Sequence, residues 1–221
     1  MKNLRSIARV TTLLLVIMSA CKKDDIKPRE VILYETDFSR NNDTAQWKTG
    51  AMGTGLSGTL QGGYYEFRNA SAKHYIVGPL NLFDGLSGSN MAVEASVKIS
   101  YVLSTQPSEA WGGLVWNNNL DNNTAFYFEI TTAGGYVIWG HPDASGDYVL
   151  YKDHTKSTTI RPGQFNVLRI ELRNRQLHFF INGTEVYSME VVNENTLKHA
   201  GLGAYPQSNL QADYFKTVQL P

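Results

Sequence analysis

The chain has 221 residues, of which 42% are hydrophobic and 11% aromatic, a composition that suits one globular domain and excludes a disordered polypeptide. Its 20 basic and 20 acidic residues give a formal net charge of zero. Without residues 1–20, which hold three basic residues and no acidic one, the count becomes 17 basic against 20 acidic. A mildly acidic chain lacks the clustered lysine and arginine that bind nucleic acid, so we expect no nucleic-acid partner.

The N-terminus is typical of a secretory leader. Residues 1–9 are basic, and residues 10–18 form an apolar run shorter than the ~20 residues of a membrane-spanning helix. The sequence Met18-Ser19-Ala20-Cys21 follows and resembles a lipobox, with methionine where leucine is usual. This resemblance implies that residues 1–20 are a lipoprotein signal peptide and that Cys21 is lipidated. Cys21 is the only cysteine in the chain, so it has no internal disulfide partner.

Residues 21–30 form the expected lipidated tether. Within them, Lys22-Lys23-Asp24-Asp25 resembles the export signal that some Gram-negative bacteria use to send lipoproteins to the outer face of the outer membrane. Two or more acyl chains anchor a protein stably, so we expect a lipid-anchored protein of the outer membrane that faces the cell surface. Two alternatives stay open: a domain that faces the periplasm, and a protein secreted in soluble form.

Residues 31–221 are typical of a single all-β domain. Apolar and polar side chains alternate over residues 91–101, which predicts a half-buried strand, and similar alternation marks residues 126–130, 168–172 and 177–181. Many short strands broken by Gly, Asn, Asp and Pro predict a two-sheet antiparallel jelly-roll sandwich. The further strands expected are 31–38, 59–68, 73–78, 111–117, 135–140, 147–153, 199–205 and 210–219.

Local signals refine this pattern. Asn182-Gly183 lies between two strand-like segments and predicts a type I′ hairpin turn, because both central residues of that turn need positive φ. Asn174-Arg175 indicates a looser turn before it. Adjacent strand residues face opposite ways, so only one of Tyr64 and Tyr65 is expected in the core. Trp47 is expected to cover one end of the sandwich.

Several motifs occur in a familiar order. Residues 162–166 (PGQFN) lead into the paired strands around Asn182-Gly183; residues 199–205 (HAGLGAY) and residues 212–218 (ADYFKTV) follow, and residues 111–116 (WGGLVW) precede them. This order resembles concanavalin A-like lectin/glucanase domains, including laminin G-like modules and the 3-keto-disaccharide hydrolase family. The resemblance implies a jelly roll of two packed antiparallel sheets. That fold hosts lectins, hydrolases and adhesion modules, so it does not assign a function by itself.

The sequence assigns no catalytic residue. The retaining glucanases that this chain resembles carry a Glu-x-Asp-x-x-Glu run on one strand, and no such run is present. Glu66, Glu129 and Glu171 stand alone, as solvent-facing strand carboxylates commonly do, and the five histidines lack metal-ligand spacing. We therefore lean against an enzyme. Acidic or histidine side chains that converge in one place would favour the alternative, a glycoside-processing hydrolase of the 3-keto-disaccharide type.

Carbohydrate binding fits the aromatic residues better. Sugar sites combine flat aromatic rings with amide and carboxylate groups, and three tryptophans lie near an Asn-rich segment. Tryptophan in a sandwich is more often part of the core, and an Asn-rich run is more often a turn. The candidate ligand-binding residues are Trp111, Trp116, Trp139, Asn117, Asn119, Asp121 and His141.

A weaker hypothesis concerns a cation. The segment from Gly140 to Asp147 places Asp143 and Asp147 beside His141, and such oxygen ligands suit Ca²⁺, as in some laminin G-like modules. A polar turn explains these residues equally well, so we expect no cofactor beyond this possible Ca²⁺. The sequence thus predicts a lipid-anchored jelly-roll domain that binds glycan or a surface partner, with a hydrolase or a structural spacer as alternatives.

Overall fold

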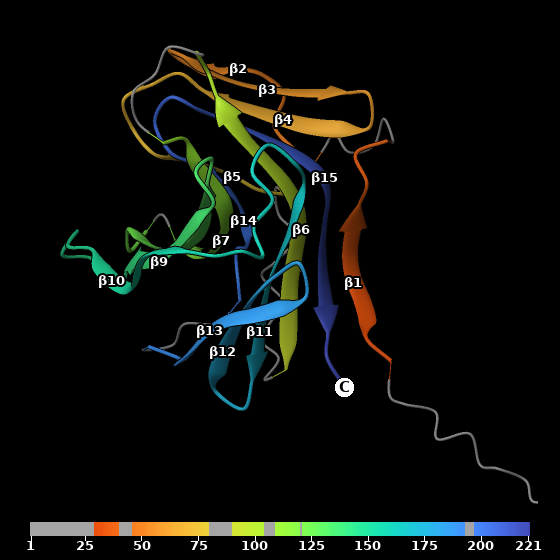
Figure 1. The fold of residues 1–221 in the computed structure, drawn as a ribbon, viewed down its shortest axis with the longest axis vertical. Helices are drawn as coiled ribbons and strands as arrows, with labels where there is room; N and C mark the ends of the chain where they lie inside the picture. The colour runs from red at the N-terminus through yellow and green to blue at the C-terminus, as the bar shows by residue number, and fades with distance from the viewer. Residues whose placement is uncertain (1–28, 40–45, 80–89, 104–108, 120, 193–196) are drawn as a thin grey trace, which may run out of the picture.

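A computed structural model describes residues 29–39, 46–79, 90–103, 109–119, 121–192 and 197–221 (Figure 1). All regular secondary structure in these ranges is β-strand. No helix in the described chain is long and apolar enough to cross a membrane. Cys21 and the first part of the expected tether lie outside the described residues.

The larger sheet, sheet A, contains nine strands in the order β13-β12-β11-β6-β15-β4-β3-β2, with β1 also paired to β15. The long strand β15 is paired with β4 at its beginning and with β1 at its end, as Figure 1 shows for β1. The strands are β1 (Val31–Thr36), β2 (Gly50–Gly53), β3 (Leu56–Gln61), β4 (Tyr64–Asn69), β6 (Met91–Tyr101), β11 (Asn166–Arg173), β12 (Gln176–Ile181), β13 (Thr184–Glu190) and β15 (Ser208–Gln219).

The smaller sheet, sheet B, contains six strands in the order β10-β9-β8-β7-β14-β5. All pairings in both sheets are antiparallel, so the predicted all-β, two-sheet sandwich is confirmed. The strands of sheet B are β5 (Tyr75–Val77), β7 (Trp111–Asn119), β8 (Thr124–Thr131), β9 (Gly135–His141), β10 (Val149–Lys156) and β14 (Gly201–Ala204).

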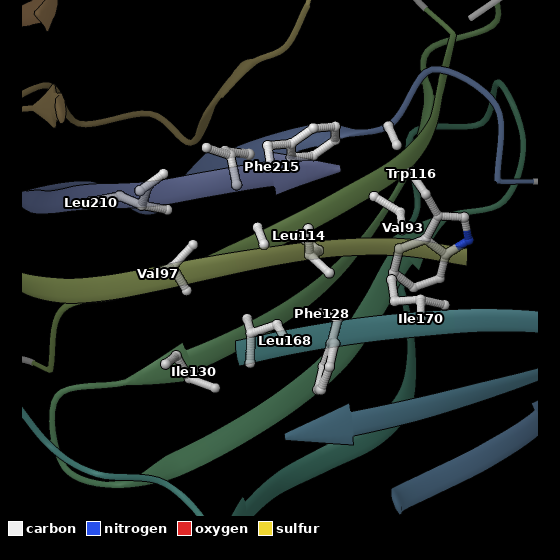
Figure 2. Close-up of a cluster of buried hydrophobic side chains, with 14 of the residues drawn as sticks. Val93, Val97, Leu114, Trp116, Phe128, Ile130, Leu168, Ile170, Leu210 and Phe215 are labelled. Atoms are coloured by element: carbon white, nitrogen blue, oxygen red, sulfur yellow. The ribbon is translucent and has the colours of Figure 1, made fainter. Parts of the chain in front are cut away.

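The hydrophobic core lies between the two sheets. Alternate residues of each strand point inward, as the two-residue period of a strand requires. Figure 2 shows Leu114, Trp116 and Phe128 of sheet B among Val93 and Leu168 of sheet A, all of them fully buried. The prediction that Trp116 contacts a ligand is therefore corrected, because its indole packs between the sheets and has no exposed surface.

Two-residue turns connect several neighbouring strands. Asn182 and Gly183 have φ of 50° and 80°, as the predicted type I′ turn requires. Asn174-Arg175 is equally tight rather than looser, because Arg173 pairs directly with Gln176 and both turn residues have positive φ. The prediction of a single strand over residues 59–68 is wrong. This segment is a hairpin of β3 and β4, turned by two glycines with positive φ at positions 62 and 63.

Strand β6 departs from the expected half-burial, because most of its residues are buried on both faces. Its outward-facing Glu94 bonds Arg169 Nη1 at 2.9 Å, Lys216 Nζ at 2.9 Å and the Tyr214 hydroxyl at 2.7 Å. These long side chains from β11 and β15 cover the outer face of β6. Alternation predicted the strand correctly, but the neighbouring strands decide how much water it meets.

Burial alone would raise the pKa of Glu94, but the hydrogen bonds from Tyr214, Lys216 and Arg169 outweigh it and leave the pKa below its usual value. A carboxyl group with a lowered folded-state pKa stabilises the fold above its unfolded pKa, and this stabilisation is lost as the pH falls through the folded value. The charge network on the outer face of sheet A therefore makes the domain sensitive to acid.

Replacing Trp116 with alanine should lower the free energy of unfolding by about 3–5 kcal/mol, because it opens a large cavity between the sheets. Urea denaturation measures this change. Tyr148→Ala is the matched control: its ring is 68% exposed, so the expected change is within about 0.5 kcal/mol. Equal stability of the two variants would contradict the placement of Trp116 in the core.

Glu94→Gln should reduce the dependence of unfolding free energy on pH. The wild type is expected to lose stability as the pH falls below the unfolded value near 4.5, whereas the variant loses less over the same interval and is less stable at neutral pH. Urea titrations at a series of pH values test this, with the exposed Glu190→Gln as control. Parallel pH profiles for all three proteins would show that Glu94 has no such role.

Candidate functional site

The face of sheet B that points away from the core carries a group of aromatic and titratable side chains. On β8, Phe126 and Phe128 point into the core, so Tyr127 and Glu129 between and after them point outward. Tyr127 pairs across the strands with Trp139 of β9. We call this surface the aromatic face; its members are His74, Trp111, Tyr127, Glu129, Trp139 and Tyr205.

Glu129 lies at the centre of the aromatic face and is fully buried. The Trp139 indole N–H donates a hydrogen bond to Oε2 at 2.8 Å, and His74 Nε2 lies 2.8 Å from Oε1. A buried carboxyl group without partners would cost several kcal/mol, so these contacts are what makes the position tolerable. In return, Glu129 fixes the orientation of both rings.

His74 reaches Glu129 from the far edge of sheet B. It precedes β5, and β14 and β7 lie between β5 and β8 in the sheet. A Cβ atom at Gly203 of β14 would lie 3.1 Å from His74 Cε1 and 2.7 Å from a methyl group of Val115. Glycine at position 203 therefore leaves the space in which the His74 ring lies.

His154 and Glu109 form a second histidine–glutamate pair, in which the histidine ring again lies over a glycine of sheet B. A Cβ atom at Gly135 of β9 would clash with His154 Nε2, so the His154 ring occupies the place of a side chain there. His154 Nε2 is 3.3 Å from Glu109 Oε2, and Lys156 Nζ is 3.8 Å from Oε1. The side chains of His154 and Glu109 are each about a third exposed.

The pKa of Glu109 is held below its usual range. A hydrogen bond from Thr131 is the main cause, opposed by partial burial and assisted by the charges of Lys156 and His154. Glu109 is therefore a carboxylate at neutral pH. The pKa of the Tyr127 hydroxyl is raised by burial, so that residue stays a neutral phenol.

The rings form a continuous band across the strands. Trp139 stacks on Tyr127 with centroids 4.1 Å apart and an angle of 15°. The Tyr205 ring connects His74 with Trp111: its centroid lies 6.0 Å from that of His74 and 5.5 Å from that of Trp111. Tyr205 is 42% exposed and Trp111 and Trp139 are partly exposed, whereas Tyr127 is buried beneath its neighbours, so a ligand can reach the band at these three rings.

The structure brings only some of the predicted site residues together. Trp111 and Trp139 lie on the aromatic face, and the His141 ring contacts Trp139 at 5.6 Å. Asn119 instead accepts hydrogen bonds from the backbone of Asp121 and Asn122, as a turn residue does. Asn117, at the same end of β7, has a positive φ of 49°. These positions are accounted for by the turn between β7 and β8.

The possible Ca²⁺ loop has no ligand set in the structure. Asp143 accepts a hydrogen bond from the backbone of Ser145, and His141 Nδ1 lies 3.2 Å from the Asp147 carbonyl oxygen. Among the described residues, no three His, Cys, Asp or Glu side chains are grouped as metal ligands. Ca²⁺ binding stays a prediction from the sequence alone.

Sequence reasoning missed His74, Glu109, His154 and Tyr205, and it treated Glu129 as a solvent-facing carboxylate. A local signal existed for Glu129. Along its strand, Tyr127 and Glu129 alternate with Phe126 and Phe128, so Glu129 shares a face with an aromatic residue. The other four residues are brought to the face by strand order. Their sequence neighbourhood shows nothing that would have singled them out.

No protein-family model and no curated protein matches this sequence. Solved structures do match, and three of them, which are 9–14% identical to the chain, show the fold alone. One comes from work on endo-acting O-glycanases that human gut bacteria express to initiate mucin breakdown; it has a TM-score of 0.58 at 14% identity and covers 86% of this chain and 100% of the other.

Two further structures extend the likeness. The catalytic domain of an endo-1,3-β-glucanase (laminarinase) from Thermotoga petrophila has a TM-score of 0.53 at 9% identity, over 86% of this chain and 98% of that one. An endo-β-galactosidase from Clostridium perfringens that releases GlcNAcα1-4Gal has a TM-score of 0.53 at 11% identity, over 86% and 62%. The domain therefore shares the fold of these structures, an antiparallel sandwich of two sheets.

Proposed function

We propose that the aromatic face of sheet B binds carbohydrate. The observation that carries this proposal is the band of partly exposed rings around Glu129, in which one carboxyl group holds Trp139 and His74 in place. Sugars present apolar C–H faces and many hydroxyl groups, so they are bound by oriented aromatic rings with polar groups beside them. Structures of the same fold that act on glucans and galactosides are consistent with this assignment.

Binding is favoured over catalysis by the state of Glu129. A catalytic carboxyl group must be free to attack the sugar or to exchange a proton with it. Both oxygens of Glu129 are already bonded, and the residue has no exposed surface. Glu129 is thus a positioning residue of the binding surface.

Glycoside hydrolysis is the second candidate, because acidic and histidine side chains do converge on this face. Glu109 and His154 are partly exposed, and the His154 ring lies 5.7 Å from Trp111, where a bound sugar would rest. A carboxylate paired with an imidazole can hold or move a proton at a glycosidic oxygen. This candidate requires Glu109 to act on the sugar directly.

We also propose that the domain is held at the cell surface of an outer membrane through a lipid on Cys21. The lipobox-like sequence and the charged residues after it support this placement. A membrane-anchored domain with an open aromatic face is suited to capture glycans from the surroundings of the cell.

Trp139→Ala and Tyr205→Ala should each weaken glycan binding, because a lost stacking contact is worth about 0.5–1.5 kcal/mol, or about two- to tenfold in Kd. A glycan array identifies ligands of the purified full-length chain, and calorimetry then measures Kd for each variant. Tyr101→Ala is the matched control, since Tyr101 is an aromatic residue of sheet A with 38% exposure. Unchanged affinity in both aromatic-face variants would refute the location of the site.

The same protein–glycan mixtures distinguish the second candidate. Release of new reducing ends by the wild type, lost in Glu109→Gln while binding is kept, would establish hydrolysis in place of simple binding. Bound glycan that stays intact over long incubation would exclude hydrolysis of that glycan.

Cys21→Ser should abolish incorporation of radiolabelled palmitate into the protein when it is produced in a Gram-negative host. Protease added to intact cells should degrade the wild-type domain if it faces outward. Labelling that persists in the variant would show that Cys21 is not the lipidated residue. Protection of the wild type from protease would place the domain on the periplasmic side.

A further inference from the structure

The strands beneath the aromatic face have an unusual distribution of charge. None of the six strands of sheet B contains arginine, and lysine occurs only in β10. On sheet A, by contrast, β11 alone contributes Arg169 and Arg173 to ion pairs with carboxylates. Carboxylate and sulfate groups on a ligand are recognised chiefly by arginine or lysine, so sheet B lacks the residues for an acidic sugar.

The lysines of β10 and the two histidines of this face already have partners, and Lys73, exposed next to His74, is the nearest other cation along the described chain. Lys156 Nζ donates to the Ala133 carbonyl oxygen at 2.7 Å and lies beside Glu109. Lys152 Nζ lies 5.8 Å from the centre of the Tyr187 ring. His74 and His154 each contact a glutamate. The lysines of β10 and the two histidines therefore offer no free positive charge to a ligand.

Glu109 adds a negative charge at the Trp111 end of the band. It is about a third exposed, and the lowered pKa keeps it ionised at neutral pH. A sugar carboxylate or sulfate placed beside it would be repelled, because like charges destabilise each other where water screens them incompletely. The charge of Glu109 therefore disfavours an acidic group at the Trp111 end of the band.

The size of the band bears on the length of the ligand. Trp139 lies on β9 and Tyr205 directly follows β14, and β8 and β7 lie between these strands. Three spacings between neighbouring strands amount to about 14 Å, and Tyr205 is also displaced along the strands, because Trp139 is level with Val115 and Gly201 whereas Tyr205 follows Ala204. The band thus exceeds a single sugar ring and has exposed aromatic groups at both ends, Tyr205 at one and Tyr148 beside Trp139 at the other.

We propose that the ligand of the aromatic face is a neutral oligosaccharide of two or more sugar units that lies diagonally over sheet B from Trp139 to Trp111. This inference rests on the proposed carbohydrate-binding function and specifies its substrate class. Hydroxyl groups of such a chain can reach the partly exposed Glu109 and His154, while its C–H faces contact the rings.

The test compares two sets of polysaccharides with the purified full-length chain in the presence of EDTA, so that no cation bridges the protein to an acidic group. Laminarin, mixed-linkage β-glucan and xylan are the neutral set; polygalacturonate, heparin and chondroitin sulfate are the acidic set. Affinity electrophoresis and calorimetry measure binding. At least one neutral polymer should bind about tenfold or more tightly than every acidic one.

Three further results support the inference. Binding of the neutral polymer should change little between about 50 and 300 mM NaCl, because no ion pair forms with the ligand. Affinity should rise from monosaccharide to oligosaccharide, and Tyr205→Ala and Tyr148→Ala should lower it while Tyr101→Ala leaves it unchanged.

Two results would overturn the inference in distinguishable ways. Salt-sensitive binding of acidic polymers, lost in Tyr205→Ala, would keep the glycan site and refute its neutral specificity. Failure of the array and of both polymer sets to bind would refute the proposed function itself, and the inference with it.

Discussion

The whole structure depends on the two-residue period of the strands in sheet B, because the same strands supply one side of the core and most of the aromatic face. On β8, Phe126 and Phe128 pack toward sheet A while Tyr127 and Glu129 point the other way. A shift of one residue would exchange the two sets and place a carboxyl group in the core. The packing between the sheets therefore fixes the site without a separate scaffold.

Glu129 links the rigidity of the sandwich to the order of the aromatic face. The fold tolerates its burial because Trp139 and His74 occupy both oxygens, and it admits the His74 ring because Gly203 has no side chain. The two sheets also divide the charges between them. Sheet A gathers ion pairs around Glu94 and Arg169 on its outer face, whereas the outer face of sheet B combines aromatic rings with two histidine–glutamate pairs.

Local sequence signals succeeded where a short segment decides its own conformation. Asn182-Gly183 turns as its residue types require, and the alternation in residues 91–101 is that of a strand. These local signals failed where the burial or the end of a strand depends on other parts of the structure. The burial of β6 on both faces comes from side chains of β11 and β15, and the glycines at 62 and 63 divide what the apolar pattern presents as one strand.

The sequence by itself determined the all-β class, the antiparallel sandwich, most strand positions and two of the tryptophans on the aromatic face. Only the tertiary structure decided that Trp116 belongs to the core and that His74 meets Glu129, 55 residues away. The physical reason is that periodicity tells which residues of a strand share a face, but not which face is covered. The order of β5, β14, β7 and β8 in the sheet sets that, and it arises from long-range pairing that no local pattern records.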